Sequence, residues 1–143
     1  MVVCALILVV VPGLSDGAIM LMRTVKSDQG SCRIIRVIDG DTVQMWCTFS
    51  GISHARLMGF DTPELFSPRC AHEMIAAAQA KWALRAKLLQ SSRIDITHHG
   101  RDIYSRDLVK MSLDGKSLAT IMITEGYARA YNGGMRRNWC FGF

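Results

Sequence analysis

Long apolar runs and zinc-binding cysteine patterns are both missing from this sequence of 143 residues. The uncharged apolar run from Val2 to Val11 is shorter than the about 20 residues that a membrane-spanning helix needs. None of the five cysteines has a CxxC spacing, and the four histidines do not stand at zinc-ligand intervals from them, which argues against a zinc ribbon. Repeats, low-complexity tracts and obvious linkers are also absent, so we expect one domain around one core.

The N-terminus has the apolar segment of an export signal without its usual basic start. No Lys or Arg precedes Arg23, but small residues before Ala18 would permit cleavage there. We expect residues 1–17 to be a signal peptide and residues 18–143 to form the mature domain, which predicts a secreted or periplasmic protein. The alternatives for the apolar segment are a membrane anchor and a buried strand.

The cysteine count agrees with export. Loss of Cys4 with the signal peptide would leave an even number of cysteines, as in a secreted disulfide framework. Three pairings are possible among the remaining four, which are Cys32, Cys47, Cys70 and Cys140. For Cys47, which lies in an apolar strand-like run, a buried free thiol is the alternative.

The charge balance is mildly basic. Lys and Arg outnumber Asp and Glu by 17 to 12, which gives a formal net charge of +5. The resulting field favours polyanions such as nucleic acid or anionic lipid, but an excess of this size does not distinguish between them.

The hydrophobic pattern predicts a mainly β, α+β domain. β-branched and alternating segments predict five strands, and helical spacing predicts two helices. The expected strands are 33–38, 42–47, 54–60, 93–97 and 106–113, and the expected helices are 68–91 and 118–124. The first helix carries one apolar stripe that we expect to lie on the sheet, formed by Ile75, Ala78, Trp82, Ala86 and Leu89. A long helix after the third strand and a shorter one after the fifth suit a five-stranded, partly open OB-fold-like barrel.

Two acidic clusters stand where the predicted strands end. They are Asp39-Gly40-Asp41-Thr42 and Asp61-Thr62-Pro63-Glu64. Each cluster alone is more often a turn than a site. Together, at one rim of a barrel, they would offer the carboxylate and carbonyl oxygens that Ca²⁺ prefers.

Two arginines strengthen the case for a phosphate site. Arg56 lies in the strand that leads to the second acidic cluster, and Arg106 begins a later strand. A guanidinium group forms paired hydrogen bonds to phosphate oxygens and stabilises charge that develops in a transition state. Metal ligands, a spare carboxylate and two arginines are what a phosphodiesterase requires.

Three segments resemble the signature segments of the staphylococcal nuclease (thermonuclease) family. They are Val37 to Val43, Ala55 to Glu64 and Asp102 to Arg106, and the similarity extends from about residue 33 to 131. The resemblance implies a Ca²⁺-dependent endonuclease that hydrolyses the 5′ P–O bond of DNA or RNA and leaves 3′-phosphorylated products.

The resemblance also implies metal ligands. Asp41 and Asp61 correspond to the Ca²⁺ carboxylates, and the main-chain carbonyl of Thr62 corresponds to a further oxygen ligand. Asp39 matches an acidic residue beside the metal, which acts through water.

The remaining roles concern the substrate. Glu64 resembles the carboxylate that activates the attacking water, and Arg56 and Arg106 resemble the pair that binds the phosphate. Tyr104 resembles the tyrosine near the 5′-phosphate, and Tyr131 lies near the position of an aromatic that contacts the base.

Three features depart from the family pattern. Ser105 occupies a position where the family commonly has glycine, so a positive φ there would strain the turn before Arg106. The family's long C-terminal helix is absent or reduced to residues 135–139. Disulfide bridges that involve Cys32, Cys70 or Cys140 could replace the packing of that helix.

Two other function classes are alternatives to a nuclease. A binding module on the same barrel would lack the catalytic and metal-binding residues. All five are present here, namely Asp41, Asp61, Glu64, Arg56 and Arg106. An envelope protein that meets anionic lipid would use the N-terminal segment but does not explain the acidic clusters. We therefore expect an enzyme with DNA or RNA as its substrate, no obligate protein partner and a monomeric state.

Overall fold

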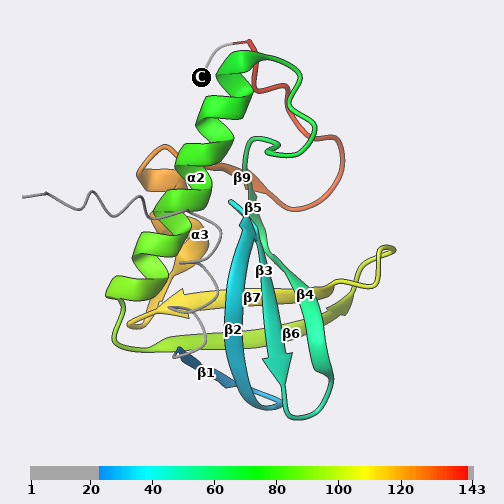
Figure 1. The fold of residues 1–143 in the computed structure, drawn as a ribbon, viewed down its shortest axis with the longest axis vertical. Coiled ribbons are helices and arrows are strands. Elements are labelled where there is room, and N and C mark those ends of the chain that lie inside the picture. The colour runs from blue at the N-terminus through cyan, green and yellow to red at the C-terminus, as the bar shows by residue number, and fades with distance from the viewer. Residues whose placement is uncertain (1–22, 142–143) are drawn as a thin grey trace, which may run out of the picture.

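The computed structural model describes residues 23–141, and a closed barrel of six strands forms its centre (Figure 1). The predicted signal peptide lies outside the described residues. The barrel strands follow one another in the order β4-β3-β2-β1-β6-β7, and pairing of β4 with β7 closes the barrel. These strands are β1 Thr24–Ser27, β2 Gly30–Asp39, β3 Thr42–Cys47, β4 Gly51–Leu57, β6 Ile94–Arg101 and β7 Asp107–Leu113.

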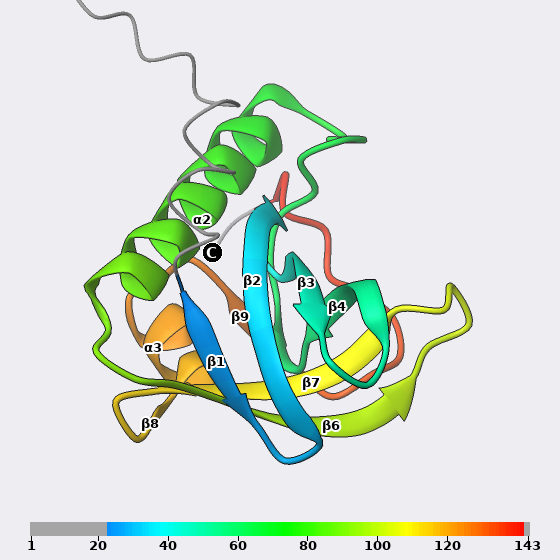
Figure 2. The same ribbon diagram turned by 60° about the horizontal axis from the view of Figure 1, so that its bottom comes forward.

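Two helices and three short strands lie around the barrel (Figure 2). Helix α2 (Ala71–Gln90) packs against β2, and helix α3 (Leu118–Thr124) packs against β7. Strand β8 (Lys116–Ser117) pairs antiparallel with β7. Strand β5 (Gly59–Asp61) pairs with β9 (Arg129–Tyr131) in a separate two-stranded sheet. None of the helices within residues 23–141 has the length and apolar character needed to cross a membrane.

The predicted OB-fold-like α+β class is confirmed, with one barrel strand more than expected. Four predicted strands correspond to β2, β3, β6 and β7, and α3 has the predicted bounds. The predicted strand 54–60 covers the end of β4 and the start of β5, which the structure separates at Met58. Strand β1 was missed because it has only four residues and buries only Val25, so its sequence shows little apolar alternation. It nevertheless joins β2 to β6 and thereby completes the barrel wall.

The predicted apolar stripe of α2 is wrong. Ile75 is 56% exposed and Trp82 is 46% exposed. The buried stripe runs instead along Glu73, Ala77, Ala80, Leu84 and Leu88. Both stripes have helical spacing, so the spacing alone did not decide which side of the helix faces the barrel.

Two disulfides are present in the structure. Cys32–Cys47 joins β2 to β3 inside the barrel, which excludes the alternative of a buried free thiol at Cys47. Cys70–Cys140 joins the start of α2 to the C-terminal segment. His98 lies near the sulfurs of the first bridge, but bonded sulfurs are not available as zinc thiolates.

Candidate active site

The first acidic cluster is the tight turn between β2 and β3. Position 40 must be glycine, because a Cβ there would lie 2.8 Å from both the Cβ of Ala80 and the Oγ1 of Thr62. Asp41 is 2% exposed, and its Oδ1 accepts a hydrogen bond from the hydroxyl of Thr42 at 2.9 Å. The turn is therefore pressed against α2 and against the second acidic cluster.

The second acidic cluster begins at the end of β5. Pairing of Asp61 with Arg129 of β9 holds this end, and the Asp61 side chain is almost fully buried. Thr62 is also buried, and its hydroxyl has no hydrogen-bond partner among the described residues. Glu64 follows on a loop and keeps about a third of its side chain exposed, 36%.

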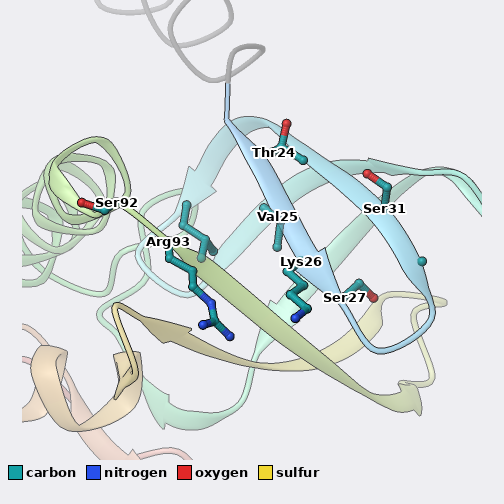
Figure 3. A pocket seen from close by; sticks show the side chains of 9 residues that line it. Thr24, Val25, Lys26, Ser27, Ser31, Ser92 and Arg93 are labelled. Atoms are coloured by element: carbon teal, nitrogen blue, oxygen red, sulfur yellow. The ribbon is translucent and has the colours of Figure 1, made fainter.

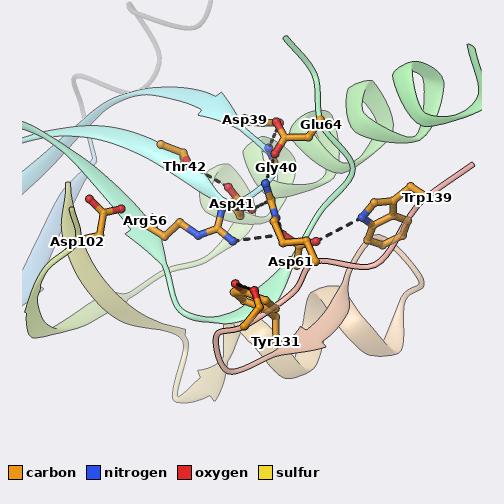
Figure 4. Close-up of polar contacts among 12 residues, drawn as sticks. Asp39, Gly40, Asp41, Thr42, Arg56, Asp61, Glu64, Asp102, Tyr131 and Trp139 are labelled. Atoms are coloured by element: carbon orange, nitrogen blue, oxygen red, sulfur yellow. Dashed lines mark hydrogen bonds and ion pairs between the residues drawn. The ribbon is translucent and has the colours of Figure 1, made fainter. Parts of the chain in front are cut away.

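Arg56 joins the two acidic clusters (Figure 4). It lies on β4 opposite Thr42 of β3, next to the first cluster. Its Nη1 is 2.5 Å from Oδ2 of Asp41, and its Nη2 is 3.3 Å from Oδ1 of Asp61. The ring of Tyr131 lies 6.0 Å from the guanidinium carbon. The structure thus brings four predicted site residues together.

Arg136 is a second guanidinium group in the same cluster, and its place there was not predicted from the sequence. Its Nε is 2.5 Å from Oδ1 of Asp61, and its other nitrogens pair with Glu64 and, at 3.5 Å, with Asp41. Burial would lower the pKa of Arg136, but hydrogen bonds and charges from these carboxylates raise it above its ordinary value. Arg136 therefore stays protonated while it bridges three carboxylates.

The C-terminal segment carries Arg136 to the site and is fixed at its end. The Cys70–Cys140 bridge attaches the segment to the start of α2. Trp139 is 4% exposed, and its indole Nε1 donates to Oδ2 of Asp61 at 3.4 Å. Residues 135–139 form no helix, so the segment reaches the site as irregular structure that is held by the covalent bridge.

Glu73 positions the loop that carries Glu64. Its buried carboxylate accepts hydrogen bonds from the backbone N–H of Glu64 at 3.3 Å and of Arg69 at 2.7 Å. Its own N–H donates to the sulfur of Cys70, the N-cap of α2. This role was not predicted from the sequence, although a Glu three residues after an N-cap is a known capping position.

The turn before β7 holds the other predicted arginine. Asp102 Oδ1 accepts from the backbone N–H of Tyr104 and Arg106, and its Oδ2 pairs with the Arg106 guanidinium at 2.7 Å. Burial alone would raise the pKa of Asp102, but these bonds lower it below its ordinary value. Ser105 has a φ of 61°, so the expected positive φ is present at this position.

Arg106 and Tyr104 lie beside the cluster rather than in it. β7 pairs in parallel with β4, and Arg56 lies opposite Leu108. Arg106 stands two residues before Leu108 and therefore lies close to Arg56. Among the described residues, its ion pair is with Asp102 and not with Asp41, Asp61 or Glu64. Tyr104 is 73% exposed and stacks near Arg106, with 5.5 Å between the guanidinium carbon and the ring centroid. The Tyr104 side chain is therefore exposed to a ligand, whereas the Arg106 guanidinium is held by Asp102.

Asp39 stands at the edge of the cluster with an altered pKa. Burial raises the pKa of Asp39 to about 6, a hydrogen bond from the N–H of Gly40 opposes the shift, and the charges of Asp41 and Glu64 add to it. The closely spaced carboxylates thus repel one another, which a bound cation would relieve.

A larger hollow of the described surface lies elsewhere (Figure 3). It lies between β1 and the start of β6, includes Lys26 and Arg93, and contains no acidic residue. A smaller cavity of about 50 Å³ lies at the acidic cluster, beside Asp61, Glu64 and Arg136. The small cavity has the converging charged groups that a site requires, and the large hollow does not.

The donor set suits a hard divalent cation. A single guanidinium group contacts Asp41, Asp61 and Glu64, so the three carboxylates surround one volume of positive charge. All candidate ligands are oxygens, and the buried Thr62 hydroxyl has no partner among the described residues. This chemistry fits Ca²⁺ or another oxygen-seeking cation rather than zinc.

A model of the staphylococcal nuclease homologue family matches residues 54–139, more than half of the chain. The chain belongs to the staphylococcal nuclease family. Members of this family are generally nucleases, and their domains bind nucleic acid. No curated protein matches the sequence significantly. The matched range begins within β4 and contains Arg56, the second acidic cluster and Arg136, whereas the first acidic cluster precedes it.

Proposed function

We propose that this member of the staphylococcal nuclease family is a Ca²⁺-dependent endonuclease acting on DNA or RNA. The observation that carries the proposal is the meeting of Asp41, Asp61, Glu64 and Arg56 at one end of the barrel. These residues come from two separate acidic clusters and one strand.

The carboxylates of Asp41 and Asp61 and the carbonyl of Thr62 would hold the metal, with Asp39 acting through water. Bound there, Ca²⁺ supplies charge neutralisation at the phosphate and a template for the attacking water. Asp41 and Asp61 are nearly fully buried, so their geometry is fixed before the ligand arrives.

The protein side chains supply the other steps. Glu64 accepts a proton from water, and the resulting hydroxide attacks phosphorus. Arg56 and Arg106 bind the phosphate and stabilise the charge of the pentacoordinate state. The 5′ P–O bond then breaks, the 5′ oxygen takes up a proton, and the phosphate stays on the 3′ side. Tyr104 and Tyr131 flank this position as contacts to the nucleotide.

A digestion assay tests the proposal. Purified protein is incubated with single-stranded DNA, duplex DNA and RNA, first with Ca²⁺ and then with a chelator. We expect cleavage only with Ca²⁺, and 3′-phosphate ends in the products. Cleavage that persists with the chelator would reject the metal mechanism, and no cleavage of any substrate would favour a binding module.

We also propose that the protein works outside the cytoplasm, in a secreted or periplasmic form. Two disulfides within the described residues support this, because such bridges persist mainly in oxidising compartments. Cell fractionation of the full-length chain, with mobility compared under reducing and non-reducing conditions, tests it. A reduced protein confined to the cytoplasm would contradict it.

A further inference from the structure

One outward face of the barrel carries exposed basic, polar and apolar side chains in two adjacent rows. The first row crosses β2, β3 and β4 as Arg36, Gln44 and His54, and the second as Arg33, Trp46 and Ile52. We call these six residues the outer strip. All are at least partly exposed, and the three strands lie side by side (Figure 2).

The outer strip leads directly from the candidate active site. The next row toward the site is Thr42 opposite Arg56. Side chains two residues apart in a strand point to the same face, so Ile52 and His54 lie on the same face as Arg56. With about 3.3 Å per strand residue, the second row is about 13 Å from Arg56.

The chemistry of the strip suits a polyanion with flat rings. Trp46 is 42% exposed and Ile52 is 66% exposed. The guanidinium of Arg33 forms no hydrogen bond or ion pair within the described residues, while that of Arg36 donates to Gln44 at 3.1 Å. From residue 30 to 57 the only carboxylates are Asp39 and Asp41, both at the site end. The strip itself therefore holds no negative charge.

We propose that the outer strip binds the flank of a single-stranded nucleic acid whose scissile phosphate lies at Arg56. The proposal rests on the proposed function, because the site defines which end of the strip the strand must reach. Trp46 offers a ring for base stacking, and Arg33 and Arg36 offer cations for backbone phosphates. Bases in a duplex are already stacked inside it, so Trp46 selects single-stranded regions.

Anionic lipid is the competing ligand for a basic face with exposed apolar residues. The strip favours nucleic acid because its row nearest the site is polar, with Gln44 and His54, and because it ends at a phosphate-binding arginine. Binding to a lipid surface would not be strengthened by the connection of the strip to Arg56.

Binding in the absence of cleavage tests the proposal. The full-length chain with Glu64→Gln, in chelator, is titrated with a fluorescent 12-nucleotide single strand and with a dinucleotide. We expect Trp46→Ala and Arg33→Gln each to weaken binding of the 12-mer by roughly 5- to 20-fold and to leave dinucleotide binding unchanged. Arg33→Gln should also reduce the slope of log affinity against log salt by about 0.7.

Matched variants separate this role from folding. Trp46→Phe should retain most of the affinity, and Trp82→Ala, which removes a similarly exposed tryptophan from α2, should retain all of it. Thermal unfolding checks that each variant folds. No measurable binding of the 12-mer, equal losses in the Trp82→Ala control, or loss of phosphatidylserine-vesicle binding without loss of 12-mer binding would overturn the proposal.

The binding assay does not depend on cleavage. If Trp46 and Arg33 control 12-mer affinity but no substrate is cleaved with Ca²⁺, the strip stands and the nuclease proposal fails. If substrates are cleaved but neither variant changes 12-mer affinity, the nuclease proposal stands and the strip fails.

Discussion

Arg136 and Asp61 are separated by 75 residues in the chain, yet Nε of Arg136 lies 2.5 Å from Oδ1 of Asp61. The same guanidinium pairs with Glu64 and reaches Asp41. It therefore contacts the carboxylates that are proposed to hold and serve the metal. The C-terminal segment thus places a guanidinium cation at the position that is proposed for the metal.

Replacement of Arg136 by Gln should tighten Ca²⁺ binding several-fold, because the guanidinium and the ion neutralise the same carboxylates. The metal-free protein should lose stability, since three close carboxylates would repel one another. Calorimetric titration and thermal unfolding measure the two effects. Arg137→Gln, at the neighbouring position, is the control. Unchanged Ca²⁺ affinity would show that Arg136 does not compete with the ion.

Glu64→Gln should reduce turnover by at least 100-fold, because the amide cannot accept the proton from water. The substitution keeps the size of the side chain and its acceptor oxygen, so the unfolding temperature should change little. Steady-state kinetics with a single-stranded substrate provide the measurement. A turnover number equal to that of the unmodified enzyme would remove Glu64 from the mechanism.

Asp39→Asn should change the pH dependence of stability. The folded pKa of about 6 lies above the ordinary value of 3.8, so folding keeps a proton on Asp39 that the unfolded chain releases. This carboxyl group therefore lowers stability as pH rises from about 4 to 6, and its effect is constant above that.

The Asn variant has no such charge, so its stability should increase relative to that of the unmodified protein as the pH rises over this range. Partial exposure of the carboxyl group limits the gain to about 1 kcal/mol. Denaturant unfolding in chelator at pH 4 and pH 7 tests this, and a stability difference that is the same at both pH values would contradict it.

The positive φ of Ser105 makes this position sensitive to side-chain shape. Ser105→Val should destabilise the fold by roughly 1–2 kcal/mol, because a β-branched residue is strained at this φ. Ser105→Gly should be neutral or slightly stabilising, since glycine adopts this φ without strain. Unfolding midpoints of the two variants give the comparison. Equal midpoints would show that the turn relaxes to another conformation.

The two disulfides should respond differently to reductant. Cys32 and Cys47 are fully buried, whereas Cys70 and Cys140 are partly exposed, so mild reductant should open the second bridge first. Its loss should cost roughly 2–4 kcal/mol and release the segment that carries Arg136. Alkylation followed by peptide mass analysis identifies the bridge that opens. A Cys70→Ser/Cys140→Ser variant with unchanged stability would show that the bridge does not constrain the fold.

The sequence by itself determined the elements whose signals are local. β-branched and alternating segments located the main strands, and the local pattern of residues 118–124 predicted the bounds of the second helix. The acidic clusters, Arg56 and the serine at position 105 were visible in the same way, since each motif lies within a few consecutive residues.

Only the tertiary structure decided contacts between distant segments. Two stripes of α2 had helical spacing, and the barrel covers the one that contains Ala80, which lies against Gly40. The pairing of Cys70 with Cys140 and the arrival of Arg136 at the acidic cluster depend on the path of the C-terminal segment. A sequence pattern encodes periodicity along the chain, but the closed barrel and its covalent bridge determine which remote charges meet.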